Sequence, residues 1–334
     1  MTALKVEKIN VAGLATNMTQ LVESMVWSGE YRQCTRTVKL TMLSAVYDRR
    51  VPEATLELTE NAMVQISYEG TVIFWGRVFE RSRATGDSRY SVTCYDLGVY
   101  LNRNEAVYAF RSATADAIAR RICRDFVVEV GSLAAPGVAI SRDFSGVSLY
   151  KIIQTGYALS AVETGEAYQL RFAATKLTAV KKIPREDTLI LRPKSNLLTA
   201  STTESAANMV NQVQIADRND RIVGTRSNAE NVALYGLMQR VIRQQDGVNM
   251  SKQAERLLAD GDVEQKISVT AMGNVELVTG NCVVVQEEVT GLNGLFWIDS
   301  DSHSWNRDGT YTCKLVLNYR RLMDETEAGS LKEA

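Results

Sequence analysis

Residues 273–319 read GNVELVTGNCVVVQEEVTGLNGLFWIDSDSHSWNRDGTYTCKLVLNY and carry the clearest fold signal in the chain. Two apolar runs, 282–285 and 295–298, precede the segment 311–317, in which apolar and polar side chains alternate. Short runs rich in Val, Thr, Tyr and Trp between Gly, Asn and Asp are typical of antiparallel strands. The Asp-Gly pair at 308–309 tolerates the positive φ that a tight hairpin turn needs. The chain is therefore predicted to end in a β-meander.

The composition is that of an ordinary globular protein and argues against several classes of function. The 334 residues are 45% hydrophobic and 23% charged, with a net charge of −1. This balance indicates neither a nucleic-acid binder nor a binder of anionic membranes. No apolar run approaches the roughly 18–20 residues of a membrane span, and the N-terminus lacks the basic-then-apolar pattern of a signal peptide. We therefore expect folding and assembly in a cytoplasm.

Cysteine and histidine usage argues against disulfides and zinc. The five cysteines form no CxxC pair, and the chain has a single histidine. An odd number of scattered cysteines is typical of buried free thiols that act as small hydrophobes. Because zinc needs clustered thiols or histidines, no metal and no cofactor is expected. The cysteines are Cys34, Cys94, Cys123, Cys282 and Cys313.

The first of three predicted blocks, residues 1–110, has the pattern of a small β-domain. Apolar and polar side chains alternate over 37–43, and a tight turn joins the expected strands 62–68 and 71–81. A period of two is the signature of strands with one buried face. This block is predicted to be a small antiparallel barrel or sandwich.

The second block, residues 111–195, mixes helices and strands. Thr114 can cap one helix, with Asp116 in its first turn, and a second helix is predicted to start at Ser148. The segment 131–146 between them contains a proline and several glycines and is predicted to be a loop. We expect a small α+β domain here.

The third block, residues 196–334, returns to strands. The pattern predicts a strand over 207–216, a turn or mobile loop over 217–231, and a helix near 250–260. The charged tail that follows Tyr319 is expected to fray. The final sheet is the meander with which the chain ends.

Five segments distributed over the chain carry a resemblance to a known family. They are VWSGEYRQCTRTVKLTM (26–42), YEGTVIFWGRVFERS (68–82), TCYDLGVYLNRNE (93–105), SRDFSGVSLYKII (141–153) and FWIDSDSHSWNRDGTYTCKLVL (296–317). These segments resemble the baseplate hub proteins of contractile phage tails, of defective prophages and of R-type bacteriocins, together with the late-control protein D group. The last segment holds the His-Ser-Trp triplet that precedes the final turn in that family.

The resemblance implies a fold and a function. The family's hubs are trimers in which each subunit contributes two tube-like β-barrels, so that three subunits form a ring of six. The chain is then expected to be mainly β with an α+β insert. Its parts would be two tube-type antiparallel β-barrels, 1–110 and 196–334, and a small α/β domain, 111–195.

Such a ring adapts a hexameric inner tail tube to a trimeric spike, beside neighbouring baseplate proteins. The resemblance therefore implies a structural component of a phage-like particle, assembled in a bacterial cytoplasm. It implies no cofactor, no specific nucleic acid and no membrane span.

The residues that could carry chemistry are expected to be structural. A general base needs a nucleophile beside it, and no second histidine or activated cysteine is expected to join His303. Three nearby aspartates suggest calcium, but Ser304 and Thr310 occupy the positions at which a calcium-binding loop needs Gly and Glu. We therefore predict no catalytic residue and no metal ligand. The aspartates are Asp299, Asp301 and Asp308.

Two further groups of residues are candidates for roles in an assembly. Glu276, Glu287 and Glu288 could line the lumen of a tube, where negative charge repels nucleic acid, or they could belong to a solvated strand face. Trp75 and Trp27 could anchor an interface, or they could pack in the core as single strand residues commonly do.

An enzyme of the particle is the main alternative. A peptidoglycan hydrolase would need a further domain with paired carboxylates in a cleft or a Cys-His site. The three blocks occupy all 334 residues. A carbohydrate-binding β-protein is a third possibility, supported only by aromatic side chains. We predict a structural hub without enzymatic activity.

Overall fold

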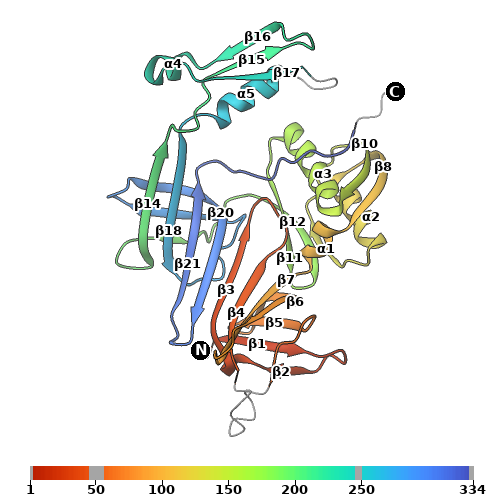
Figure 1. Cartoon of the computed structure of the whole chain (residues 1–334), viewed down its shortest axis with the longest axis vertical. Helices are drawn as coiled ribbons and strands as arrows, with labels where there is room; N and C mark the ends of the chain where they lie inside the picture. Colours follow the sequence, from red (N-terminus) through yellow and green to blue (C-terminus); the bar gives the residue numbers. More distant parts are fainter. Residues whose placement is uncertain (1–2, 45–55, 245–249, 331–334) are drawn as a thin grey trace. The chain divides into compact units, whose positions relative to one another are not determined.

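The computed structural model describes residues 3–44, 56–244 and 250–330 (Figure 1). The chain divides into two compact units, Met1–Ala200 with Ser268–Ala334, and Ser201–Ile267. The larger unit therefore brings together the two ends of the chain. The division into blocks at residues 110 and 195 stays a prediction.

A thirteen-stranded sheet takes its strands from both ends of the chain. The strands are β1 Leu4–Ile9, β2 Ala15–Asn17, β3 Val22–Glu30, β4 Thr37–Leu43, β5 Met63–Tyr68, β6 Thr71–Arg83, β7 Arg89–Asp96, β13 Ile190–Leu191, β14 Leu197–Ser205, β18 Glu264–Met272, β19 Cys282–Glu287, β20 Leu292–Asn306 and β21 Tyr311–Asn318. Their hydrogen-bonded order is β14-β18-β21-β20-β3-β4-β7-β6-β5-β1-β2, and β19 joins β20 and β13. The short 3-10 helix η1 Thr19–Leu21 precedes β3. The mainly β, antiparallel character is confirmed, whereas the closure into two tube-type barrels stays a prediction.

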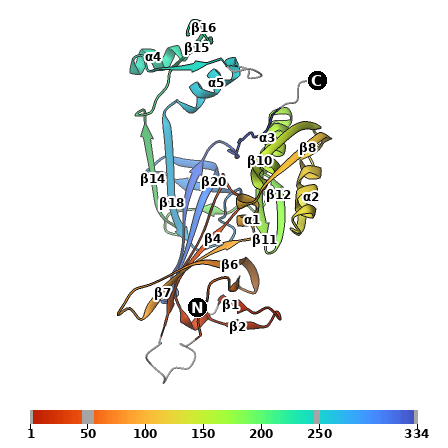
Figure 2. The same ribbon diagram turned by 45° about the vertical axis from the view of Figure 1, so that its right-hand side comes forward.

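Strand β20 joins the N-terminal and C-terminal strands. It pairs antiparallel with β3 from Ser300↔Glu30 to Asn306↔Ser24, and with β21 on its other side. Figure 1 shows β3, β20 and β21 running side by side, and Figure 2 shows the same sheet turned by 45°. Because β19 pairs with β20 as well, the predicted C-terminal meander is confirmed.

The alternation in the sequence corresponds to burial in the sheet. In β4, Val38, Leu40 and Met42 are at most 1% exposed, while their neighbours on the strand face outward. These side chains belong to a hydrophobic cluster that also contains Trp27 and Trp305. The cluster therefore includes residues from the N-terminal strands and from β20.

A second core of the larger unit lies between helices and short strands. Its elements are α1 Gly98–Arg103, β8 Glu105–Ala113, α2 Ala115–Asp125, β9 Val130–Leu133, β10 Ile140–Ser148, α3 Leu149–Thr164, β11 Tyr168–Ala173 and β12 Lys176–Lys181. Strand β8 pairs with β10, and β12 lies between β11 and β9. The predicted helix starts are confirmed, and the Ser148 hydroxyl accepts a hydrogen bond from the Lys151 N–H at 3.4 Å. Thr114 directly precedes α2, but its hydroxyl donates to Asp116 Oδ1 at 2.7 Å and makes no capping hydrogen bond.

The predicted loop over 131–146 is wrong. Most of this segment is strand, because β9 pairs in parallel with β12 and β10 pairs antiparallel with β8. Only the short connection between β9 and β10, which contains Pro136, has no regular structure. Pairing with distant strands outweighs the local glycine and proline signals.

The described part of the tail, residues 320–330, packs against the α+β insert, so the predicted fraying is wrong for these residues; residues 331–334 lie outside the described residues. Met323 and Asp324 are 7% and 8% exposed. The Tyr150 hydroxyl donates to Asp324 Oδ2 at 2.6 Å, and the Lys182 ammonium donates to the Leu322 carbonyl at 2.5 Å. The tail supplies the acceptors that these buried polar groups require, which the tail's own composition does not reveal.

The smaller unit has a three-stranded sheet of its own. Its elements are β15 Gln212–Ala216, β16 Ile222–Ser227, α4 Ala229–Tyr235, β17 Gln239–Arg243 and α5 Met250–Asp260. The sheet order is β16-β15-β17, and a small cluster of Val213, Ile215, Met250 and Ala254 forms its core. The helix near 250–260 is confirmed. The predicted loop over 217–231 is wrong, since β16 pairs with β15 and α4 follows it.

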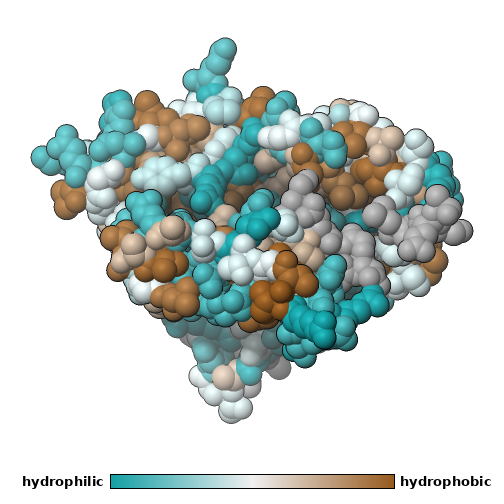
Figure 3. All heavy atoms as spheres, turned by 90° about the horizontal axis from the view of Figure 1, so that it is seen from above, coloured by the Kyte–Doolittle hydropathy of each residue, from teal (hydrophilic) through white to brown (hydrophobic). Residues whose placement is uncertain are grey.

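The state of the cysteines and the character of the surface match what the composition predicts. All five cysteines are buried and free, as predicted. Figure 3 shows hydrophobic residues reaching the surface in several places among hydrophilic ones. Of the helices in the described part of the chain, none combines the length and apolar character needed to cross a bilayer.

Candidate functional site

His303 lies at the centre of the junction between β3, β20 and β21. It is directly opposite Trp27 of β3 and Cys313 of β21, and its side chain is 0% exposed. Because side chains alternate along a strand, Asp301 and Trp305 lie on the same face of β20 as His303. The only histidine is thus enclosed by residues from both ends of the chain.

Hydrogen bonds fix the imidazole of His303. Its Nε2 lies 3.1 Å from the Leu277 carbonyl oxygen and 3.3 Å from Asp301 Oδ2, and its Nδ1 lies 2.8 Å from the Tyr311 hydroxyl. A carbonyl oxygen only accepts, so in the neutral ring Nε2 carries the proton and Nδ1 accepts from Tyr311. Both ring nitrogens are therefore satisfied inside the core.

The structure brings Cys313 to His303, which the sequence analysis did not anticipate. The Cys313 Sγ lies 3.1 Å from His303 Nδ1, so Cys313, His303 and Asp301 stand in the order of a Cys-His-acid catalytic arrangement. Burial raises the pKa of Cys313 to about 11, which disfavours the reactive thiolate. All three side chains are buried, so no substrate reaches this arrangement.

Asp301 connects this cluster to the guanidinium of Arg36, whose side chain is 12% exposed. Arg36 Nη1 donates to Asp301 Oδ1 at 3.0 Å, and Arg36 Nη2 contacts Asp301 Oδ2. The N–H and hydroxyl of Thr279 donate to Oδ1 at 2.7 and 2.6 Å. Burial alone would raise the pKa of Asp301, but Arg36 and the hydrogen bond from His303 hold it well below its usual range. The carboxylate therefore stays ionised and ties together β20, residues 275–281 and the β3–β4 connection.

The three aspartates considered for calcium do not converge. Asp301 forms an ion pair with Arg36. Asp299 is buried elsewhere, with 7% of its surface exposed. Asp308 accepts a hydrogen bond from the Thr310 N–H at 2.8 Å within its own turn. Over the described residues, no group of three or more His, Cys, Asp or Glu side chains could hold a metal ion.

The candidate lumen acids occupy three different environments. Glu276 pairs with Arg185 at 3.1 Å, and Glu288 is exposed. Glu287 is 8% exposed and accepts from the backbone N–H of Val289 and Thr290. The hydroxyl and N–H of Thr290, with Val289, lower the pKa of Glu287, so this carboxylate caps the β19–β20 turn. Their role as lumen residues stays a prediction.

The two candidate interface tryptophans also differ. Trp27 is 5% exposed and carries the Arg36 guanidinium 3.9 Å above its ring centroid, whereas Trp75 on β6 is half-buried. Their interface role stays a prediction. Sequence reasoning missed Arg36, Cys313 and Thr279 as partners of the His303 cluster. The alternation of Asp301, His303 and Trp305 was the only local signal for a shared face.

The fold is that of phage tail proteins. The chain is similar to the 43 kDa tail protein of prophage MuSo2 from Shewanella oneidensis, with a TM-score of 0.69 over 94% of this chain and 97% of that one, at 15% sequence identity. The chain belongs to the YqbQ-like family, whose model matches residues 25–318.

Two relatives from Bacillus subtilis (strain 168) support this assignment. The protein YqbQ is 26% identical over 307 residues, which cover 89% of this chain and 92% of YqbQ. The phage-like element PBSX protein XkdQ is 25% identical over 300 residues, covering 87% of this chain and 90% of XkdQ. The predicted relation to proteins of phage-like elements and phage tails is confirmed.

Proposed function

We propose that this protein is a structural hub in the baseplate of a phage-like particle. Three copies form a ring that adapts a hexameric inner tail tube to a trimeric spike, and neighbouring baseplate proteins surround it. The relation to XkdQ of the phage-like element PBSX supports a place in such a particle. The particle is assembled in a bacterial cytoplasm, and the hub uses no cofactor.

The observation that carries this proposal is the pairing of β3 with β20. It makes one sheet out of an N-terminal group of strands and a C-terminal group. Each subunit thereby presents the N-terminal and the C-terminal group of strands at a fixed spacing. Three subunits then present six such groups. A sixfold arrangement is what a hexameric tube needs on one side, while the three chains match a trimeric spike.

The ends of the sheet supply surfaces for self-association. Among the strands of the described residues, β2 has only β1 as a neighbour and β14 has only β18. Open edges offer unpaired backbone N–H and C=O groups that proteins cover or pair. Beside β2, the apolar side chain of Leu14 is 67% exposed. We infer that a neighbouring copy covers this region.

Light scattering after size-exclusion chromatography tests the proposal. The full chain alone should run at three times its mass of 37.0 kDa, and with its tube and spike partners it should run as a larger complex that contains three copies of the chain. Leu14→Asp should weaken the trimer, whereas Val162→Asp on α3, with the same 67% exposure, serves as the matched control. A stable monomer at micromolar concentration with both partners present would overturn the hub function.

A further inference from the structure

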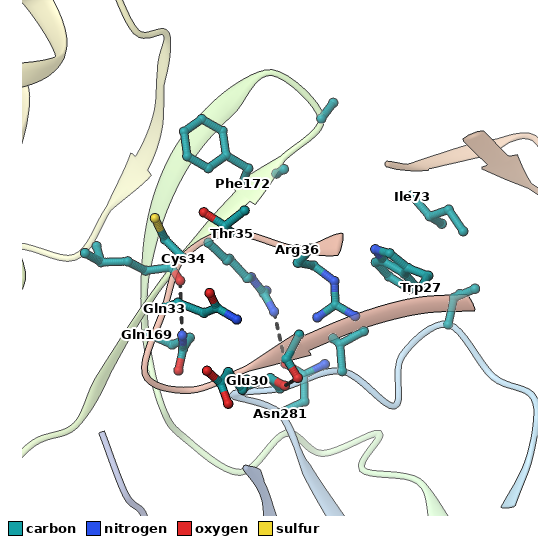
Figure 4. Close-up of a pocket in the computed structure, with 18 of the residues that line it drawn as sticks. Trp27, Glu30, Gln33, Cys34, Thr35, Arg36, Ile73, Gln169, Phe172 and Asn281 are labelled. Carbon is teal, nitrogen blue, oxygen red and sulfur yellow. Dashed lines mark hydrogen bonds between the residues drawn. The ribbon is translucent and has the colours of Figure 1, made fainter. Parts of the chain in front are cut away.

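A cavity of about 280 Å³ opens in the larger unit beside the His303 cluster. Strand β3 and the β3–β4 connection, the start of β6, strand β11, and residues between 275 and 281 form its walls. Figure 4 shows Trp27, Arg36 and Ile73 on one side and Gln33 and Gln169 on the other. Nothing in the proposed hub function accounts for a cavity at this place.

The most unusual group in this cavity is the guanidinium of Arg171 on β11. Its side chain donates to the neutral amide oxygen of Asn281 at 3.3 Å, and no carboxylate of the described residues forms an ion pair with it. Burial, and then the like charge of Arg36, lower the pKa of Arg171. The nearby Glu276 offsets this effect in part but is paired with Arg185.

A desolvated cation without a counter-charge is costly to the subunit. The guanidinium has five N–H donors in a planar fork that matches a carboxylate. One long bond to Asn281 leaves most of that capacity unused. The chain therefore keeps a cationic group at a position where, by itself, it gains little stability.

Further unsatisfied polar atoms belong to residues of the same cavity wall. In the described part of the chain, Arg36 Nε, Trp27 Nε1 and Gln169 Oε1 are buried side-chain atoms without a hydrogen-bond partner. Two of these three atoms are donors. Buried polar groups are normally paired, so the wall around Arg171 is poor in hydrogen-bond partners, and the accessible guanidinium of Arg171 is the group that a ligand in the cavity would meet.

We propose that this cavity receives the carboxylate side chain of an aspartate or glutamate from a partner protein, and that Arg171 binds it through two parallel N–H···O bonds. The volume is below the roughly 300–1,000 Å³ of sites for drug-sized ligands, so it suits a single side chain. Ile73 and Phe172 line the cavity and can contact the methylene stem. Glu30 and Glu276 also line it, and their negative charge opposes a dianionic phosphate more strongly than a singly charged carboxylate.

The proposal relies on the hub function only for the existence of a partner, and a small-molecule probe separates the two. N-acetyl-glutamate N-methylamide carries one side-chain carboxylate, and N-acetyl-glutamine N-methylamide is its neutral counterpart. At constant ionic strength, the glutamate compound should raise the Tm of the full chain with increasing concentration, as a ligand of the native state does. The glutamine compound should leave Tm unchanged. Inorganic phosphate is a third arm, and a larger shift with phosphate would contradict a carboxylate site.

Variants of arginine identify the group responsible. Arg171→Met should abolish the Tm shift with the glutamate compound and should leave the ligand-free Tm equal or higher, because a half-buried cation without an ion-pair partner is removed. Arg124→Met is the matched control, since this arginine on α2 is 70% exposed and pairs only loosely with Asp125 at 3.5 Å. It should keep the full response.

A second measurement makes the outcome independent of how the variants fold. The chain has four tryptophans, so 15N-labelled protein gives four indole N–H signals, of which Trp27 belongs to the cavity wall. The glutamate compound should shift the Trp27 signal and leave that of Trp297 unchanged. An unchanged Trp27 signal together with an unchanged wild-type Tm, or a Tm shift that persists in Arg171→Met, would overturn the proposed site. A protein that is trimeric but shows no such response would keep the hub function and lose this inference.

Discussion

Arg36 and Asp301 are 265 positions apart in the chain and form a buried ion pair, with Arg36 Nη1 3.0 Å from Asp301 Oδ1. The Asp301 side chain is 0% exposed and that of Arg36 is 12% exposed. The pair lies beside the β3–β20 ladder that joins the two groups of strands. The charges therefore help to fix the register of the junction on which the proposed hub geometry depends.

Removing one partner of this pair should destabilise the fold strongly. Asp301→Asn leaves Arg36 buried without its counter-charge, so we expect the free energy of unfolding to fall by about 3–5 kcal/mol. The double variant Arg36→Met, Asp301→Leu should cost less than the sum of the single variants. Urea denaturation measures both quantities.

An exposed ion pair provides the control. Arg185 and Asp187 lie 2.8 Å apart, with side chains 54% and 69% exposed. Arg185→Met should cost about 0–1 kcal/mol, because water solvates the remaining charge. Equal losses at the two sites would show that burial does not set the strength of the Arg36–Asp301 pair.

His303→Ala should lower stability without removing any catalytic activity. The variant leaves the Leu277 carbonyl and the Tyr311 hydroxyl without their partner, at a cost of about 1–3 kcal/mol for a buried hydrogen-bonding group. Ser302→Ala, on the opposite face of β20, is the control. Incubation with purified cell wall should give no bond cleavage for either variant or for the wild type. If the wild type cleaves the cell wall and His303→Ala or Cys313→Ala does not, the result would favour the alternative that the protein is a peptidoglycan hydrolase.

Asp299 should make stability depend on pH between about 4 and 6. Burial raises the pKa of Asp299 from 3.8 to about 6, against the opposing effects of Asn318 and Lys182. The folded state then holds a proton that the unfolded state releases, so this contribution is complete below pH 3.8 and is lost as the pH rises through 6. The slope approaches at most about 1.4 kcal/mol per pH unit.

Asp299→Asn should flatten this slope, because the amide does not titrate. The unfolding free energies of wild type and variant, compared across that pH range, give the contribution of the single group. Asp308→Asn, at an exposed turn residue, should retain the wild-type slope. Identical pH profiles for wild type and Asp299→Asn would contradict the raised pKa.

Tyr150→Phe should reveal how firmly the C-terminal tail is held. The change removes the 2.6 Å bond to Asp324, which is 8% exposed, and leaves a buried carboxylate oxygen without its donor. We expect a loss of about 1–3 kcal/mol. Tyr108→Phe removes a similar 2.9 Å bond to Asp125 at an exposed site, and it should change stability little. Limited proteolysis should cut the tail faster only in Tyr150→Phe.

Local patterns predicted the elements whose formation depends on their own residues. The strands over 37–43 and 311–317 follow from alternation, and the start of α3 follows from the capping hydroxyl of Ser148. The start of α2 was also predicted, although Thr114 makes no capping hydrogen bond there. The strands within 131–146 could not be predicted in this way, because their partners, β12 and β8, contribute the decisive hydrogen bonds.

The candidate site was predictable only in part. A structural role for His303 followed from the lack of a second histidine, but the cluster around it assembles from segments that no local pattern connects. Arg36, Thr279 and Cys313 reach it from three different segments. The packed tail after Tyr319 was missed for the same reason, since its acceptors serve Tyr150 and Lys182 of the insert.

The place of β20 in the sheet has a consequence for how the chain folds. Its neighbours are β3, which begins at Val22, and β21, which ends at Asn318. While the ribosome is still synthesising the chain, β3 therefore exposes one unpaired edge until β20, which ends at Asn306, has emerged. Such late closure of long-range pairings slows folding and leaves intermediates prone to aggregate. Low temperature and slow expression should therefore increase the yield of soluble protein.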